Sequence, residues 1–205
     1  RYDCAKELTD ILNMERKGVA TIEALQGVLP SYTKLGMASL LPNRSISLDD
    51  KNNVYVDGIS ASGTENRDKI LKSKNPDSIA VAYNDIKDIS ATNFRNIFSG
   101  KKVIYIYHNV IDARGDNAST EREVFDAVED AFIELNQLVG HIVSRANGSN
   151  IYITSDHGFL YRRGHLDSTH KIKYESDESY GKRYAITDTY EEKSGTLTFS
   201  MDYIL

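Results

Sequence analysis

The stretch Asn150–Phe159 (N-I-Y-I-T-S-D-H-G-F) decides how the rest of the chain is interpreted. Its first part, Ile151–Thr154, is β-branched and aromatic, which is typical of a buried strand. The run then ends in Asp156, His157 and Gly158. At the carboxyl end of a strand in an open α/β sheet, an acid and an imidazole would lie where such sheets bind ligands. The simpler alternative is an Asx-type turn, in which Asp156 caps the next segment and His157 is solvated.

A second stretch of similar composition favours the ligand site over the Asx-type turn. Val103–Tyr107 is another apolar and aromatic run, and it is followed by acids and a histidine. A long amphipathic helix is predicted between the two runs, and a right-handed crossover of this kind brings two parallel strand ends to one sheet edge. Oxygen and imidazole ligands of this mixture hold zinc or manganese. We therefore expect one crevice to be lined by His108, Asp112, Asp116, Asp156 and His157.

The alternative for Asp112 and Asp116 is that both are solvated surface acids beside Arg114, as most exposed acids are. If the segment is one helical turn, the spacing of four residues instead places the two carboxylates on the same side. His165 and His170 lie beyond Phe159, the end of the stretch quoted first. Most histidines in such positions are simply exposed to solvent.

The composition limits the classes of protein to which the chain can belong. A chain of 205 residues with 40% hydrophobic and 27% charged residues predicts a globular domain with a true core. The formal net charge of −5 does not favour a polyanion such as duplex DNA, so a phosphate substrate would need a local positive centre. Cys4 is the single cysteine, and the sequence shows no signal peptide or membrane-spanning run. These features predict a cytoplasmic protein without a membrane partner.

The periodicity predicts an α/β fold, with a mostly parallel sheet, helices on both faces and peripheral hairpin inserts. Helices are expected over residues 1–16, 35–41, 66–72, 84–98 and 120–145, and strands over residues 19–25, 46–48, 54–56, 78–83, 103–107 and 151–154. A further short strand is expected near residues 184–187.

No G-x-S-x-G, P-loop, H-E-x-x-H or C-x-x-C motif occurs, which leaves the acid and histidine set as the candidate chemistry. Ser31 and Thr33 come just before a predicted helix. A hydroxyl there could attack phosphorus if a metal lowered its pKa. The commoner alternative is an ordinary helix cap.

Three segments together resemble the PglZ domain, a family of the alkaline phosphatase superfamily that occurs in bacterial BREX anti-phage systems. They are Pro30–Met37 (P-S-Y-T-K-L-G-M), Tyr107–Asp112 (Y-H-N-V-I-D) and Thr154–Tyr161 (T-S-D-H-G-F-L-Y). The resemblance runs over nearly the whole chain and implies an alkaline-phosphatase-like core spanning residues 1–205. It also implies a metal-dependent hydrolase of phosphoesters or phosphodiesters.

The resemblance assigns roles to individual residues. Thr33 matches the superfamily's nucleophile, Asp156 and His157 match its paired metal ligands, and Asp112 matches the acid of an Asp-x-x-x-His motif. The sequence departs from that motif at Asp116, which stands where the family has histidine and makes the site more negative.

Two further departures concern residues that the resemblance leads us to expect. The family carries an aspartate at the end of a first strand, a few residues upstream of the segment like Arg1-Tyr2. We therefore expect the domain to be truncated at its N-terminus, with that strand missing. The far histidine of the first metal site has only His165 and His170 as candidates, and His108 is a further possible ligand.

The resemblance also implies a divalent cofactor, zinc before manganese, and a phosphoester substrate such as a nucleotide or nucleic acid. Its implied partners are other proteins of the phage-defence system. The rival hypothesis is a non-catalytic docking module that keeps the fold while its metal site is incomplete. Asp116 and the missing aspartate favour the docking module, whereas the enzyme is favoured by the retained Thr33, Asp112, Asp156 and His157.

Overall fold

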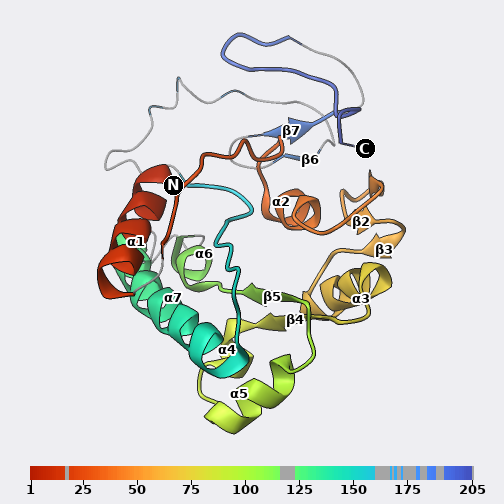
Figure 1. Cartoon of the computed structure of the whole chain (residues 1–205). Helices are drawn as coiled ribbons and strands as arrows, with labels where there is room; N and C mark the ends of the chain where they lie inside the picture. Colours follow the sequence, from red (N-terminus) through yellow and green to blue (C-terminus); the bar gives the residue numbers. More distant parts are fainter. Residues whose placement is uncertain are drawn as a thin grey trace. The chain divides into compact units, whose positions relative to one another are not determined.

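A computed structural model of the chain (Figure 1) describes residues 1–16, 19–115, 123–159, 167, 169, 172, 179–180, 184–187 and 192–204. The chain forms two compact units, each built from two separate stretches of sequence. The first unit contains residues 1–25 and 63–154, and the second contains residues 26–62 and 155–205. The candidate nucleophile Thr33 and the Asp156-His157 pair therefore belong to the same unit, the second.

The first unit has a two-stranded parallel sheet, formed by β4 (Ser78–Ala82) and β5 (Val103–Tyr107). The two strands pair in register from Ser78 opposite Val103 to Ala82 opposite Tyr107. The helices of this unit are α1 (Tyr2–Glu15), α3 (Thr64–Lys74), α4 (Tyr83–Ile86), α5 (Ala91–Phe98), α6 (Val110–Gly115) and α7 (Val124–Ala146).

The core of the first unit follows from the alternation of its strands. Side chains two residues apart on a strand share a face. Ile79 and Val81 of β4 accordingly pack with Ile104 and Ile106 of β5 against one apolar cluster. The centre of that cluster consists of buried side chains from α4, α5 and α7, namely Tyr83, Ile86, Phe94, Phe98 and Leu138.

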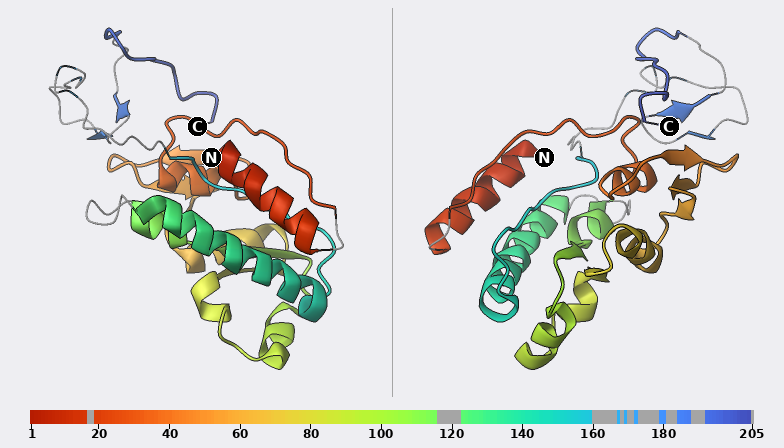
Figure 2. Two further views of the ribbon diagram at one scale, coloured as in Figure 1. Left: turned by 90° about the vertical axis from the view of Figure 1, so that its left-hand side faces the viewer. Right: turned by 45° about the vertical axis from the view of Figure 1, so that its right-hand side comes forward.

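The long helix α7 forms because an apolar stripe recurs at helical spacing over about four turns. Its buried residues are Val124, Ala127, Val128, Ala131, Phe132, Asn136 and Leu138. Helices α1, α5 and α6 pack against α7, and Figure 2 shows α1 running beside it in both views. No helix in the described ranges is long and apolar enough to cross a membrane.

The second unit contains α2 (Thr33–Ser39) and a three-stranded antiparallel sheet, β1 (Ile46–Leu48), β2 (Val54–Val56) and β3 (Ile59–Ser60). A small antiparallel pair, β6 (Ser179–Tyr180) and β7 (Ala185–Ile186), also belongs to it. Helix α2 packs against β2. Buried Leu35 and Ala38 of the helix and Val54 and Val56 of the strand form the core at this contact.

The mixed α/β composition is confirmed, but a mostly parallel sheet is not. The largest sheet in the described ranges is antiparallel, and the parallel sheet has two strands. The expected strand at residues 151–154 is not formed in these ranges, and its Tyr152 side chain is 91% exposed. The expected strand at residues 19–25 is not formed either, and Val19 is 90% exposed. A β-branched run favours extended backbone, but only pairing with a neighbour makes it a strand.

The helix expected over residues 84–98 is two helices, α4 and α5. The second helix begins just after Ser90, because the Ser90 side chain accepts a hydrogen bond from the Asn93 backbone N–H at 3.2 Å and caps α5. The predicted helices near residues 1–16, 66–72 and 120–145 correspond to α1, α3 and α7, and the predicted hairpin corresponds to β1 and β2. The strand expected near residues 184–187 is present as β7.

Candidate active site

Thr33 and His157 are in direct contact within the second unit. Thr33 is the first residue of α2, and its Oγ1 lies 3.1 Å from Nε2 of His157. The other ring nitrogen, Nδ1, lies 3.0 Å from the carbonyl oxygen of Gly158. A carbonyl only accepts, so in the neutral imidazole Nδ1 carries the proton and Nε2 presents a lone pair. The Thr33 hydroxyl therefore donates to Nε2.

This orientation of the imidazole is the one found in metal-binding histidines, which usually donate their second ring N–H to a carbonyl or carboxylate. The Gly158 carbonyl fixes the ring of His157 in this way, because it holds the proton on the nitrogen that faces away from Thr33. The atom left facing Thr33, Nε2, is available either to a proton or to a cation.

Asp156 completes the arrangement. Its Oδ2 is buried, lies 3.5 Å from Nε2 of His157, and has no hydrogen-bond partner in the described part of the chain. The side chains of Asp156 and His157 are 17% and 16% exposed. A buried carboxylate oxygen that faces a nitrogen lone pair is unfavourable unless a positive group lies between them. This pair of donor atoms therefore fits a divalent cation.

Gly36 allows α2 to approach the Asp156 backbone closely. A Cβ built on Gly36 would lie 2.4 Å from the Asp156 carbonyl oxygen and 2.9 Å from its carbonyl carbon. Gly36 follows Thr33 by three residues, so both are on the same face of the helix. The glycine in the T-K-L-G segment thus lets the helix face that carries Thr33 contact the segment that carries Asp156 and His157.

The chain entering α2 is held by a residue far along the sequence. The Tyr203 hydroxyl donates to the Leu29 carbonyl oxygen at 2.5 Å and accepts from the Leu29 backbone N–H at 2.7 Å. Both hydrogen-bonding groups of this residue are thereby satisfied just before Pro30-Ser31-Tyr32-Thr33. Sequence reasoning did not find Tyr203, because no local pattern links it to a backbone position 174 residues away.

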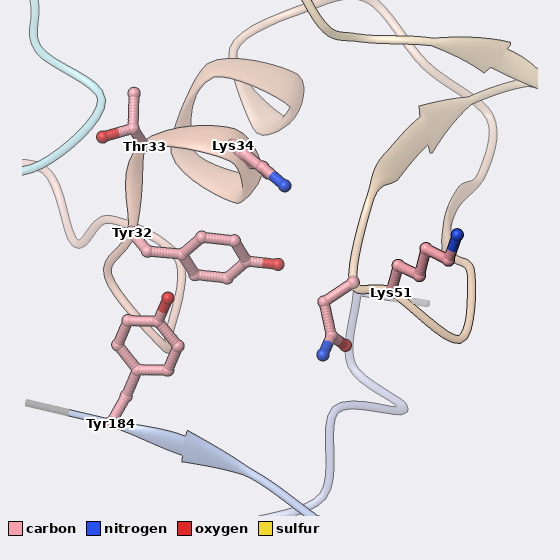
Figure 3. A pocket seen from close by; sticks show the side chains of 6 residues that line it. Tyr32, Thr33, Lys34, Lys51 and Tyr184 are labelled. Atoms are coloured by element: carbon pink, nitrogen blue, oxygen red, sulfur yellow. The ribbon is translucent and has the colours of Figure 1, made fainter. Parts of the chain in front are cut away.

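A hollow of about 220 Å³ adjoins the start of α2 in the second unit (Figure 3). The rings of Tyr32 and Tyr184 stack at its side, with their centroids 5.0 Å apart and their planes inclined by 24°. Two lysines lie around it, Lys34 directly after Thr33 and Lys51 near the tip of the β1–β2 turn. Among the described residues, the lining consists of Tyr32, Thr33, Lys34, Lys51, Asn52 and Tyr184.

His108 and Asp112 belong to the first unit. His108 follows β5, and its Nε2 lies 2.6 Å from Oε2 of Glu134 on α7. Its ring lies against that of Tyr83, with centroids 4.9 Å apart. Glu134 was not predicted from the sequence, because no pattern distinguishes it from the other polar residues of α7. Asp112 lies in the first turn of α6.

The structure thus brings together three of the predicted site residues, Thr33, Asp156 and His157. Asp116, His165 and His170 lie outside the described residues, and the convergence of Asp112 and His108 with the Asp156-His157 pair stays a prediction. Among the described residues, no three His, Cys, Asp or Glu side chains form a group that could hold a metal.

Comparison with known proteins identifies the class. The family of BREX system PglZ alkaline phosphatase-like domains matches residues 1–205. The mixed α/β units and the grouping of Thr33, Asp156 and His157 are consistent with an alkaline phosphatase-like domain. More particularly, the chain belongs to the PglZ family.

Two curated relatives support this assignment. The chain is 49% identical over 207 residues to the alkaline phosphatase-like protein PglZ of Bacillus cereus (strain H3081.97), covering 100% of this chain and 24% of that protein. It is 41% identical over 192 residues to the alkaline phosphatase-like protein BrxZ of Escherichia coli O9:H4 (strain HS), covering 91% of this chain and 22% of that protein. The chain therefore spans about a quarter of the length of these relatives. No solved structure matches it.

Proposed function

We propose that this chain is the phosphoester- or phosphodiester-hydrolysing part of a BREX anti-phage system, with Thr33 as the nucleophile. The proposal rests on one arrangement of atoms. The Thr33 hydroxyl lies 3.1 Å from Nε2 of His157, and the buried Oδ2 of Asp156 faces the same nitrogen without a hydrogen-bond partner among the described residues. An alcohol beside a candidate cation position is the minimum that metal-assisted phosphoryl transfer requires.

Asp156 Oδ2 and His157 Nε2 would hold the divalent ion, zinc before manganese, with Asp112 and Asp116 as the further carboxylate ligands that the family resemblance suggests. A bound ion would supply Lewis acidity, which lowers the pKa of the nucleophile and stabilises charge on the phosphoryl oxygens. His108, His165 and His170 stay proposed additional ligands.

The residues of the chain then have distinct tasks. With Nε2 of His157 on the cation, the Thr33 hydroxyl would release its proton to solvent. The Thr33 oxygen would form the new bond to phosphorus as the bond to the leaving ester oxygen breaks, and that oxygen would take a proton from water. A water molecule would then attack the phosphothreonine, which releases phosphate or its monoester and restores the Thr33 hydroxyl. The Gly158 carbonyl keeps the Nδ1 proton of His157 in place, so that Nε2 stays available. Nε2 has a single lone pair, so it serves either the Thr33 proton or the cation at one time. Gly36 keeps Thr33 next to this pair.

The proposed setting follows from the family and its relatives. We infer a cytoplasmic protein that acts with other proteins of the same defence system, on a nucleotide or nucleic-acid phosphoester. The family is described as belonging to the BREX system, which supports these partners. The lysines beside Thr33 support an anionic substrate despite the net charge of −5.

The proposal is tested with the complete protein, purified and analysed for bound metal. We expect hydrolysis of bis(para-nitrophenyl) phosphate that is lost with a chelator and restored by zinc or manganese. Thr33→Ala should lower kcat by roughly a thousandfold or more, because the nucleophile is removed, and should leave metal content unchanged. Thr33→Ser should retain much of the rate.

Thr9→Ala serves as the matched control, because Thr9 lies on α1 and donates its hydroxyl to the Ala5 carbonyl in the first unit. Its rate should equal that of the unmodified protein. If Thr33→Ala hydrolyses the ester at the original rate, Thr33 is not the nucleophile. If the metal-loaded complete protein shows no chelator-sensitive hydrolysis of any phosphoester, the rival docking-module hypothesis replaces this proposal.

A further inference from the structure

The hollow beside Thr33 is lined by side chains rich in hydrogen-bond donors. Lys34, Lys51 and Asn52 offer N–H groups, and Tyr32 and Tyr184 offer O–H groups. Among the described residues, no carboxylate lines it. In a chain with 30 acidic residues against 25 lysines and arginines, such a lining is a local exception. A phosphate group has only acceptor oxygens at its surface and carries negative charge, so this lining suits it.

Lys51 reaches the hollow because the β1–β2 turn is held in shape. The Asp49 carboxylate accepts hydrogen bonds from the backbone N–H groups of Lys51 at 2.9 Å and Asn53 at 2.8 Å. Asn52 has φ of 54°, a left-handed conformation that asparagine tolerates better than most residues. Lys34 is tied to the same turn, since its Nζ donates to Oδ1 of Asn53 at 3.0 Å. The two lysines are therefore placed by one hairpin.

Tyr32 adds a further hydrogen-bond donor to the hollow. Its hydroxyl is buried and has no hydrogen-bond partner in the part of the chain that the structure describes. Burial, with a smaller effect of Tyr184, raises the pKa of Tyr32 to about 12, so the group stays protonated at neutral pH. In Figure 3 the Tyr32 hydroxyl points toward the side of the hollow where Lys51 lies.

Thr33 lines the same hollow, but in Figure 3 its side chain points away from the two lysines. The lysines therefore do not face the atom that would attack phosphorus. A phosphate bound between Lys34 and Lys51 is, for this reason, a different phosphate from the one that Thr33 would attack. A substrate with two phosphate groups along one chain would place one phosphate at Thr33 and the other at the lysines.

We propose that this hollow binds the flanking phosphate of a polynucleotide, one nucleotide away from the linkage that is cleaved. The inference rests on the proposed function for the identity of the scissile linkage. Lys34 and Lys51 contact the flanking phosphate, and the stacked Tyr32 and Tyr184 form the wall against which the adjoining sugar and base lie. Aromatic side chains suit a base of any sequence, because every base has a flat π-face.

The test uses the complete protein and two chromogenic probes that differ in one group. Thymidine 5′-(para-nitrophenyl phosphate) carries one phosphate, and its 3′-phosphorylated derivative carries the flanking phosphate as well. We expect kcat/KM to be about tenfold higher for the 3′-phosphorylated probe, mainly through a lower KM, because charged hydrogen bonds to phosphate contribute at this level. The ratio of the two kcat/KM values is the readout.

Lys51→Ala and Lys34→Ala should each reduce this ratio, and the double variant should bring it to about one. Lys51→Arg should largely retain it, since a cation with N–H donors remains. Lys69→Ala is the matched control, because Lys69 pairs with Glu65 on α3 in the first unit, and it should leave the ratio unchanged. A ratio near one in the unmodified protein, or an unaltered ratio in the double variant, overturns the inference.

Calorimetric binding separates this inference from the proposed function. Thymidine 3′,5′-bisphosphate should bind more tightly than thymidine 5′-monophosphate, and the double lysine variant should lose the difference even if no hydrolysis is ever observed. Hydrolysis without any preference between the probes would leave the proposed function standing and remove the flanking-phosphate site. Binding of inorganic phosphate that depends on both lysines, without preference for the bisphosphate, would assign the hollow to a free anion and also overturn the inference.

Discussion

Gly36 and Asp156 approach each other so closely that a Cβ on Gly36 would lie 2.4 Å from the Asp156 carbonyl oxygen. Both partners in this contact are backbone, so neither can move aside as a flexible side chain would. The contact places the helix of Thr33 against the segment of His157, which lies 124 residues after Thr33 in the sequence. The position of the candidate nucleophile therefore depends on the absence of a side chain at residue 36.

Gly36→Ala should separate α2 from the Asp156 segment. We expect the free energy of unfolding to fall by roughly 1–3 kcal/mol, as overpacking in a close contact does. The rate of hydrolysis per folded molecule should fall as well, because Thr33 and His157 would no longer be in hydrogen-bond contact. Gly27→Ala is the control, because a Cβ there meets no atom within 4 Å. Chemical denaturation and steady-state kinetics measure both effects, and equal behaviour of the two variants would contradict the packing argument.

Asp156→Asn should affect the metal-free and metal-loaded proteins in opposite directions. Without a cation, the buried Oδ2 faces a nitrogen lone pair, so removing its charge should stabilise the protein by about 1 kcal/mol or more. With zinc present, the same change removes a ligand and should reduce the rise in Tm that zinc produces. Thermal unfolding with and without zinc measures both. A variant that is stabilised by zinc as strongly as the unmodified protein would exclude Asp156 as a ligand.

Glu134→Ala should destabilise the first unit. Glu134 holds Nε2 of His108 at 2.6 Å, and the two side chains are 28% and 12% exposed. Removing the carboxylate leaves a mostly buried imidazole nitrogen unsatisfied, which should lower the free energy of unfolding by roughly 1–3 kcal/mol. Glu134→Gln should lose less, because its amide oxygen can still accept. Glu129→Ala, at an exposed position of α7, should change stability by less than about 0.5 kcal/mol.

The β1–β2 turn should weaken at low pH. Hydrogen bonds from the Asn53 side chain, and then from backbone N–H groups, lower the pKa of Asp49 from its ordinary 3.8 to about 2. Because this pKa is lowered on folding, the stabilisation is complete above the ordinary pKa of Asp and is lost as pH falls through about 2. Carboxyl carbon chemical shifts in NMR spectra should therefore show Asp49 titrating well below an ordinary aspartate. A midpoint near 3.8 would show that the turn does not hold this carboxylate.

Local patterns predicted the strongest elements. The apolar stripe of α7, the periodicity of α1 and the paired runs of β1 and β2 each carry their signal within a few residues. The prediction was wrong for Ile151–Thr154, where a strand-like sequence forms no strand in the described ranges. It was also wrong for the continuous helix over residues 84–98, because a Ser90 cap competes with helix continuation.

For the candidate site, the sequence by itself determined which groups can do chemistry. Thr33, Asp156 and His157 were identified by residue type and by the resemblance of their surrounding segments. Their contact at 3.1 Å, the Gly158 carbonyl that orients the imidazole and the Gly36 approach were decided only by tertiary structure. The same holds for Tyr184, Tyr203 and Glu134, whose partners lie far away in the sequence. Hydrogen bonds and close packing act over a few ångströms in space, and no local pattern encodes which distant segments meet at that range.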